Sequence, residues 1–438
     1  MTENVLVLDG SNPGGDDLAE PRAHLLAELE RRGATVRLIR LQEEPLAHCI
    51  GCFGCWVETP GLCRSRDRSD ELLETMLGCD TVVLLTPVTS GGYSSTLKRF
   101  VDHWIQTALP FFVQRHGETH HPLRYSAFPR IVAIGVARNP DPSETRLFQT
   151  LVPRNALNFM APSWSAGIVS LADPAEEIRR FLETSLPDGE SPVPLPASSA
   201  RPWRTGTPGR VLLLVGSPKT RSASTSGVLG GHLLGDLQAR GWTADTLVLK
   251  PAIQGSAGQE RLFRAVDEAD LVLLAFPLYI DALPYLTTLA LELLACRPMS
   301  GKGLAVLVNS GFPEARQNHL AAAMCARFAA GAGMAWAGSL AMGAGEALSS
   351  GEPLAPRHGV GRPPVGHVIK ALDLSAEALA AGLPIPFEAS ALMARNPFLG
   401  LPFGLWRRVF SFMGKRHWQQ MARRNCADLR ARPLALQG

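Results

Sequence analysis

The feature that most constrains the fold is an internal repeat. The segment NVLVLDGSN at residues 4–12 recurs as RVLLLVGSP at 210–218, and CDTVVLLTPVT at 79–89 recurs as ADLVLLAFPLY at 269–279. A self-similarity with a period of about 200 residues indicates that one structural design is built twice along the chain. A length of 438 residues is also too long for one ordinary domain. The sequence therefore predicts two tandem domains.

Each repeat alternates short apolar runs with segments of helical periodicity. The apolar runs are continuous and rich in Leu and β-branched residues, as in parallel strands that are buried on both faces. In the first repeat, strands are expected at 5–8, 36–41, 81–85 and 130–135, and helices at 18–33, 70–77 and 95–109. This alternation predicts α/β domains with doubly wound parallel sheets. The loops at the carboxyl ends of such strands form the ligand crevice.

The composition of the chain suggests where the domains end. Residues 187–208 are rich in Pro, Ser and Gly and lack periodicity, so they are expected to form a linker. We expect a first domain at 1–186 with a Cys-rich loop, a second domain at 209–372, and a basic helical extension at 373–438.

The extension carries an unusual charge. Residues 385–438 hold nine Lys and Arg against two acidic residues, in a chain whose net charge is +3. The remainder is therefore net negative, which argues against nucleic-acid binding. Residues 396–413 mix aromatic and basic side chains, so they are expected to form an amphipathic helix that packs on its own domain or a dimer partner, or to contact a membrane surface peripherally.

The sequence also gives expectations about location. No apolar run reaches the ~20 residues that cross a bilayer. The first residues, MTENV, lack the basic and apolar segments of a secretion signal. We therefore expect a cytoplasmic protein without a transmembrane segment.

Four of the eight cysteines lie within fifteen residues, in CIGCFGCWVETPGLC at 49–63. Closely spaced thiolates can face one soft metal or cluster, and a turn at Pro60 and Gly61 would fold the chain back to close such a site. A zinc ion on four cysteines and four free thiols in a tight loop remain alternatives. A disulfide framework is the least expected, because nothing marks the chain for secretion.

The loop at 216–226, GSPKTRSASTS, leaves a strand and enters a helix. Its hydroxyl groups, its backbone amides and the positive end of the helix dipole suit a phosphate monoester, and Lys219 and Arg221 add positive charge. The equivalent first-domain loop at 10–15 is followed by Asp16 and Asp17, whose charges oppose phosphate binding there.

A third loop, TPVTSGGYSSTLKRFVD, occupies residues 86–102. Its paired glycines would let the backbone approach a flat ring closely, and Ser94 or Ser95 would cap the following helix. Lys98 and Asp102 are four residues apart on that helix, which is typical of a surface ion pair. His103, His120 and His121 are interpreted as surface or helix-end histidines rather than catalytic ones.

These motifs together resemble the NAD(P)H-dependent FMN reductases and iron-sulfur flavoproteins of the flavodoxin-like superfamily. The resemblance covers both repeats, and it includes FPLY at 276–279, NSGFPEA at 309–315 and the basic tail. It implies two tandem flavodoxin-like sheets with a C-terminal helical extension. FMN would accept hydride from NAD(P)H, and the protein would supply orientation and backbone donors, so no acid-base catalytic residue is nominated. Thr89 stands where the family often has an aromatic residue.

The resemblance also implies a set of site residues. The expected cofactor-binding residues are Gly10, Ser11, Thr86, Pro87, Val88, Thr89, Ser90, Gly91, Ser217, Lys219, Arg221, Ser222, Ser224, Ser226, Pro277, Leu278, Tyr279, Ile280, Asn309 and Gly311. The expected ligands of a [4Fe-4S] cluster are Cys49, Cys52, Cys55 and Cys63.

Three functions follow from these expectations. The first is a flavin-dependent NAD(P)H oxidoreductase that reduces a small acceptor such as a quinone, nitro or azo compound. The second is an iron-sulfur flavoprotein that carries electrons to a protein partner. The third is a tandem flavodoxin-fold scaffold whose four cysteines bind zinc. The sequence does not specify which domain binds flavin, whether NADH or NADPH is the donor, or whether the chain forms a homodimer.

Overall fold

The computed structural model covers the whole chain and describes residues 2–15, 17–171, 174–187, 196, 202–204, 208–219, 224–348, 354, 365–395 and 402–435. Contacts between residues divide the chain into two compact units. The first comprises Met1–Pro192 with Val409–Gly438, and the second comprises Val193–Arg408. The tandem arrangement predicted from the repeat is therefore confirmed.

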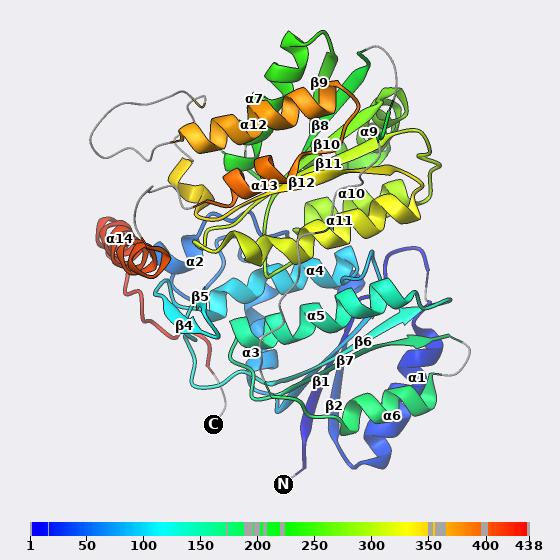
Figure 1. Cartoon of the computed structure of the whole chain (residues 1–438). Coiled ribbons are helices and arrows are strands. Elements are labelled where there is room, and N and C mark those ends of the chain that lie inside the picture. Colours follow the sequence, from blue (N-terminus) through cyan, green and yellow to red (C-terminus); the bar gives the residue numbers. More distant parts are fainter. Residues whose placement is uncertain are drawn as a thin grey trace. The chain divides into compact units, whose positions relative to one another are not determined.

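The first unit is built on a five-stranded parallel sheet (Figure 1). The order of its strands across the sheet is β2-β1-β3-β6-β7, which is the flavodoxin order 2-1-3-4-5 when strands are counted along the chain. The strands are β1 Asn4–Asp9, β2 Thr35–Arg40, β3 Thr81–Pro87, β6 Arg130–Ala137 and β7 Trp164–Ser170. The strands β4 Val113–Arg115 and β5 Glu118–His120 form a separate antiparallel hairpin in this unit.

Helices cover both faces of this sheet. One face packs against α1 Ala19–Arg31 and α6 Ala175–Glu183, through a core that includes Leu25, Leu29 and Phe181. The remaining helical segments are η1 Leu41–Glu43, α2 Gly54–Val57, α3 Ser69–Leu77, α4 Ser95–Val101, η2 Asp102–Thr107 and α5 Pro142–Asn158. The helix expected at 95–109 is thus shorter, because the chain tightens into a 3₁₀ helix at Asp102.

The second unit repeats this design. Its parallel sheet has the order β12-β11-β10-β8-β9, which is again 2-1-3-4-5 when it is read from β9. The strands are β8 Arg210–Val215, β9 Thr243–Val248, β10 Leu271–Pro277, β11 Gly303–Asn309 and β12 Ala335–Met342. The first helices are α7 Thr225–Ala239, α8 Leu249–Ala252, α9 Gly255–Glu268, α10 Tyr285–Ala295, η4 Ala315–Asn318, α11 His319–Gly331 and η5 Gly345–Leu348.

Two further helices complete the second unit. They are α12 Gly366–Ala380 and α13 Phe387–Met393, and they share one hydrophobic core with α7 and the sheet. The boundary expected at 372 falls inside α12, because the apolar face of this helix continues to Leu379. Most of the linker expected at 187–208 lies outside the described residues.

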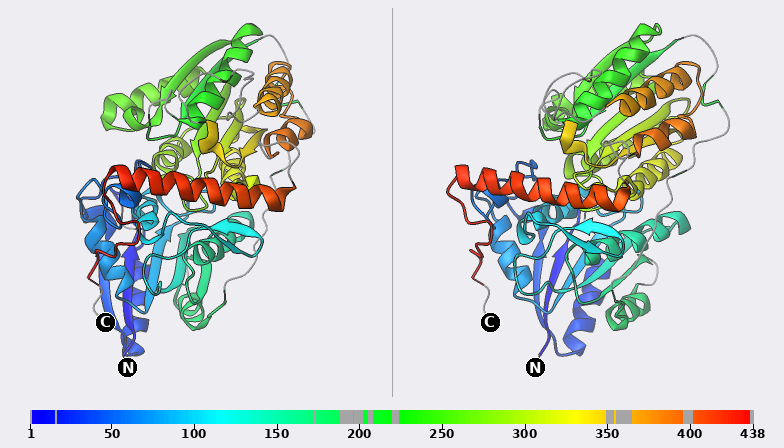
Figure 2. Two further views of the ribbon diagram at one scale, coloured as in Figure 1. Left: turned by 90° about the vertical axis from the view of Figure 1, so that its left-hand side faces the viewer. Right: turned by 60° about the vertical axis from the view of Figure 1, so that its left-hand side comes forward.

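The tail forms one long helix, α14 Phe403–Arg424, and residues from Val409 onward belong to the first unit. Figure 2 shows α14 beside the β4–β5 hairpin, where Phe410 meets Phe112 with 5.2 Å between ring centroids. The expectation that this segment is a helix packed on its own chain agrees with the structure. None of the helices in the described part of the chain combines the length and apolar composition needed to cross a bilayer.

Candidate functional site

Corresponding loops of the two units have the same backbone geometry. The amide of Gly10 donates to Leu85 O at 2.8 Å, and the amide of Gly216 donates to Ala275 O at 2.8 Å. A Cβ at Gly10 would lie 2.8 Å from Leu97 Cβ, and one at Gly216 would lie 2.2 Å from Thr287 Oγ1. Both positions need glycine because the first turn of another helix, α4 in the first unit and α10 in the second, passes directly against the backbone.

The first-unit loop holds a buried carboxylate that the sequence reasoning missed. Asp9 is fully buried at the end of β1 and accepts from both the amide of Ser11 at 2.8 Å and its hydroxyl at 2.5 Å. Arg22 Nη1 balances the charge at 2.5 Å. The donors of Ser11 are therefore directed at Asp9. Asp16 lies outside the described residues, and the exposed Asp17 is 3.6 Å from Arg138.

The second-unit loop has a different character. Ser224 caps α7 by accepting from the amide of Gly227 at 3.0 Å, and Ser226 Oγ donates to Asn309 Oδ1 at 2.7 Å. Ser217 is buried and accepts from the amide of Lys219 at 3.2 Å. The described residues of this loop, 216–219 and 224–226, include no carboxylate. The expected residues Arg221 and Ser222 lie outside the described residues.

The loops after β3 and β10 both end in the same tight turn. Thr89 and Gly92 exchange backbone hydrogen bonds of 3.0 and 2.9 Å, and Tyr279 and Ala282 exchange two of 3.1 Å. The residues between each pair have positive φ: Ser90 at 50° and Gly91 at 80°, and Ile280 at 48° and Asp281 at 57°. A β-branched residue such as Ile280 is strained in this region, and such strain concentrates at functional sites.

Each of these turns is tied to the next strand of its sheet. The amide of Val88 donates to Val136 O at 3.2 Å, and the amide of Leu278 donates to Asn309 O at 2.7 Å. In the second unit, Asn309 therefore joins the turn loop to Ser226. The structure thus gathers the expected residues 277–280, Asn309 and Ser226 at the carboxyl edge of one sheet, while 86–91 lie at the same edge of the other.

Lys98 and Asp102 do not form the surface ion pair that was expected. Their side chains are only 2% and 1% exposed, and Lys98 Nζ bonds directly to Asp102 Oδ1. The i, i+4 spacing is correct, but this face of the helix is turned into the unit. Both His103 and His120 are buried, so neither is a surface residue. His103 lies at the start of η2, in agreement with the helix-end interpretation, whereas His120 lies in β5.

The four cysteines of the loop are free thiols. Burial raises the pKa of Cys49 to about 12 and raises that of Cys55 as well, and the other cysteines of the loop add to both shifts. Burial acts in the same direction on Cys63, yet hydrogen bonds with His103 and Ser65 hold its pKa below the ordinary value. The four side chains therefore lie close enough to influence one another electrostatically.

The turn predicted at Pro60 and Gly61 is present. The amide of Leu62 donates to Thr59 O at 2.8 Å, and that of Gly61 donates to Cys55 O at 2.8 Å. Gly61 has a φ of +87°, and a Cβ there would lie 2.6 Å from Cδ of Pro433. The turn brings the chain back toward Cys55 and places it against the tail.

Aromatic residues of the loop and the tail form one cluster. The ring of Trp56 stacks on that of Phe53 with 4.8 Å between centroids, and both rings meet Trp418 of α14, at 5.1 and 5.2 Å. Asn425 Nδ2 donates to Val57 O at 2.9 Å. The sequence did not indicate that the tail supplies the third ring of this cluster.

The spacing of the sulfurs bears on the choice of metal. One set of three ligand-type side chains in the described residues has its ligand atoms within 4.8 Å of one another, and it is His232, Asp236 and Asp373 of the second unit. The cysteines of the loop form no such set, although all four are described. Tetrahedral zinc with bonds of 2.3 Å would hold its sulfurs ~3.8 Å apart. At least some of the four sulfurs therefore lie farther apart than a bound zinc ion would hold them.

Residues 4–159 match the family model described as NADPH-dependent FMN reductase. This match lies within the first unit and covers about a third of the chain. The matched range contains the Cys-rich loop, the loop at 86–102 and the strand that follows it, so it includes every expected site residue of the first unit.

Two curated relatives are iron-sulfur flavoproteins of Methanocaldococcus jannaschii. One is 36% identical over 99 residues, which are 22% of this chain and 50% of the relative. The other is 29% identical over 79 residues, 18% of this chain and 39% of the relative. The chain thus spans half or less of the length of these two proteins.

Solved structures with similar folds include an FMN-dependent NADH-azoreductase from Bacillus anthracis in complex with FMN. It is 16% identical, with a TM-score of 0.30, and the match covers 41% of this chain and 94% of that one. A flavone reductase is 16% identical with a TM-score of 0.28, covering 41% of this chain and 59% of that one.

Proposed function

We propose that this protein is an NAD(P)H-dependent flavin oxidoreductase that uses FMN and reduces a small acceptor such as a quinone, nitro or azo compound. The observation that carries the proposal is the match of residues 4–159 to the FMN reductase family model, a range that includes the turn loop after β3. The same turn, with positive φ at both central residues, recurs after β10. Both turns follow the carboxyl ends of parallel strands, where sheets of this kind bind ligands, and this supports the proposal.

The loops that follow the first strand of each unit differ in how well they would bind the phosphate of FMN. In the first, a phosphate at the loop after β1 would meet the buried carboxylate of Asp9. In the second, the described loop offers Ser217, Lys219 and the N-terminus of α7, and these favour an anion. Within this proposal, the second unit holds the phosphate, and residues 277–280 with Asn309 orient the ring. When bound, FMN would accept hydride from NAD(P)H and pass on its electrons.

The assignment to the second unit has a direct test. Lys219→Glu places a negative charge in the second-unit loop, and Asn12→Asp places one in the first-unit loop. We expect the first change to weaken FMN binding at least tenfold and the second to change it less than twofold, as followed by quenching of flavin fluorescence. Loss of binding in Asn12→Asp with no change in Lys219→Glu would assign FMN to the first unit.

A [4Fe-4S] cluster on Cys49, Cys52, Cys55 and Cys63 is part of the same proposal. The four cysteines are free thiols of one loop, and the two curated relatives are named iron-sulfur flavoproteins. This loop also supports a second candidate function, an electron carrier that serves a protein partner.

The deciding experiment is purification without oxygen, followed by an absorption spectrum, analysis of iron, sulfide and zinc, and assays with NADH and NADPH. Bound flavin with steady consumption of the donor in the presence of a quinone supports the oxidoreductase. Flavin that is reduced once without turnover supports the electron carrier. A protein that binds neither added FMN nor iron would refute both functions, and zinc would then indicate a scaffold.

A further inference from the structure

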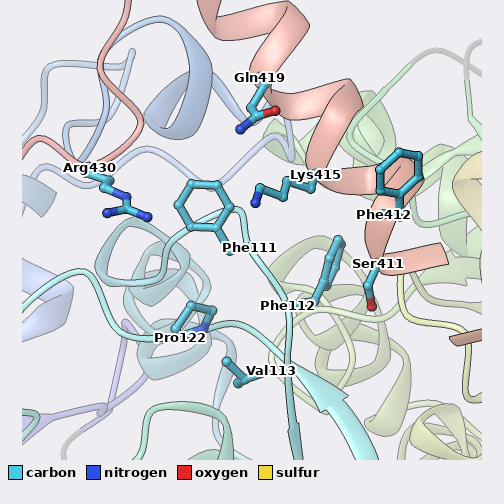
Figure 3. Close-up of a pocket in the computed structure, with 9 residues that line it drawn as sticks. All are labelled: Phe111, Phe112, Val113, Pro122, Ser411, Phe412, Lys415, Gln419 and Arg430. Atoms are coloured by element: carbon cyan, nitrogen blue, oxygen red, sulfur yellow. The ribbon is translucent and has the colours of Figure 1, made fainter. Parts of the chain in front are cut away.

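A hollow of about 690 Å³ lies in the first unit between the segment at Phe111–Val113 and one face of α14 (Figure 3). The side chains of α14 that line it include Phe412, Lys415 and Gln419, which follow helical spacing. Arg430, from the segment after α14, closes one side. This volume falls in the range of small-molecule sites.

The walls of the hollow are aromatic. Phe111 and Phe112 are half-buried, and Phe412 remains 61% exposed. Three phenylalanine rings around one space offer a large apolar surface to a flat ligand, and aromatic rings favour offset or edge-to-face contacts with another ring. An exposed ring of this size is stabilised when a ligand removes it from water.

The charged side chains at the hollow are both cationic. Figure 3 shows the Lys415 ammonium and the Arg430 guanidinium directed toward the space around Phe111. The guanidinium carbon of Arg430 lies 5.6 Å from the centroid of the Phe111 ring. The lining residues include no carboxylate. A ligand that fits both walls and rim is therefore a planar aromatic acid.

A short series of rings connects the hollow to the Cys-rich loop. His121 Nδ1 donates to Phe111 O at 2.7 Å, and the imidazole lies 5.2 Å from the ring of Phe112. The same imidazole meets Trp56 at 4.7 Å, and Trp56 follows Cys55 in the chain. One imidazole thus separates the hollow from the indole of Trp56, which belongs to the loop.

We infer that this hollow binds the electron acceptor as a planar aromatic acid, with its rings between Phe111, Phe112 and Phe412 and its carboxylate or sulfonate beside Lys415 and Arg430. The inference rests on the proposed function. For a quinone, the acceptor takes two electrons and two protons and leaves as the hydroquinone. The electron pair and one proton come from NAD(P)H, which becomes NAD(P)⁺, and the second proton comes from solvent.

The test uses the FMN-loaded full chain and two probes, anthraquinone-2-sulfonate and the neutral 2-(hydroxymethyl)anthraquinone. Calorimetry gives the Kd of each in the absence of NAD(P)H. We expect Lys415→Met and Arg430→Met each to raise the Kd of the sulfonate about 5- to 10-fold, as for loss of a charge-assisted contact, and to leave the neutral probe within twofold. Phe412→Ala, at a position exposed enough to be tolerated, should weaken both probes alike.

Arg423→Met is the matched control, because this exposed cation lies on the same helix but does not line the hollow. Wild-type affinity for the sulfonate in both Lys415→Met and Arg430→Met, or an equal loss in Arg423→Met, would overturn the inference. The two proposals fail separately. If the variants show the expected binding pattern but no NAD(P)H is consumed, the proposed function fails and the site stands. If turnover occurs but the KM for the sulfonate is the same in these variants as in the wild type, the proposed acceptor site is wrong and the proposed function stands.

Discussion

Arg124 Nη1 donates to the carbonyl oxygen of Leu429 at 3.0 Å, although 305 positions separate the two residues in the sequence. The same nitrogen donates to Ala431 O at 2.8 Å, and Nη2 reaches Ala108 O at 3.4 Å and Cys55 O at 3.5 Å. Burial lowers the pKa of this guanidinium. A fully buried cation thus joins the tail to the Cys-rich loop through main-chain dipoles.

Replacement of Arg124 by Met should release the tail. The methionine keeps the apolar stem, but it leaves several buried carbonyl groups without their donor, which costs about 2–4 kcal/mol in the free energy of unfolding. Denaturant unfolding measures this loss, and limited trypsin digestion should cut after Arg423 or Arg424 faster than in the wild type. Arg423→Met serves as the surface control and should stay within about 0.5 kcal/mol. Unchanged protection of the tail in Arg124→Met would show that the aromatic cluster holds it alone.

The buried pair of Lys98 and Asp102 leads to a second prediction. Lys98→Met leaves the buried Asp102 carboxylate without this counter-ion, so we expect a loss of about 3–5 kcal/mol in unfolding free energy. The double variant Lys98→Met with Asp102→Asn removes both charges and should recover at least half of the loss. Urea unfolding of the single and double variants tests this coupling. Additive losses would mean that the two side chains act independently.

The repeat predicted the two sheets correctly because strands buried on both faces must be continuous apolar runs, and such runs are readable in the sequence. The burial of Lys98 could not be predicted in this way. A spacing of four residues shows that two side chains share a helix face, but not whether that face meets solvent or another segment.

The packing of the tail could not be predicted from the sequence either, because it depends on residues that are distant in the sequence. Its aromatic and basic composition predicted an amphipathic helix. The partner of that helix depends on Trp56 and Arg124, which are far away in the sequence and carry no local signal of the contact. Asp9 was missed for a related reason, since a carboxylate that ends a strand looks like any loop residue until its bonds with Ser11 and Arg22 are seen.

The turn after β3 gives a third prediction. Gly91 has a φ of +80°, and a Cβ there would lie 2.5 Å from Leu147 Cβ. Gly91→Ala should therefore cost about 2 kcal/mol or more, from backbone strain and the collision with α5. At Gly15 no atom lies within 4 Å of an added Cβ, so Gly15→Ala should stay within about 0.5 kcal/mol. Equal melting temperatures for the two variants would contradict the turn geometry.

The strain at Ile280 leads to a fourth prediction. Here the substitution should raise the unfolding free energy or leave it unchanged, whereas Gly91→Ala should lower it. Asn accepts a positive φ more readily than a β-branched residue, so Ile280→Asn should relieve roughly 1 kcal/mol of backbone strain at the turn after β10. We expect equal or higher unfolding free energy together with weaker FMN binding, because Ile280 lies on the loop proposed to orient the ring. A variant that is destabilised by 1 kcal/mol or more would show that the packing of Ile280 outweighs the strain.

The final prediction concerns the pH dependence that His121 confers. Burial lowers the pKa of His121 from 6.5 to about 4, so between these values the unfolded chain binds a proton that the folded protein does not. Stability that is present above about pH 6.5 is therefore lost as the pH falls toward 4. His121→Gln removes this contribution, and its melting temperature should fall about 5 °C less than that of the wild type between pH 7 and pH 4.5. His116→Gln, at an exposed position of the same hairpin, should follow the wild-type curve. If His121→Gln also follows that curve, the folded protein protonates this imidazole as readily as the unfolded chain does, and the layer between the hollow and Trp56 is charged at acidic pH.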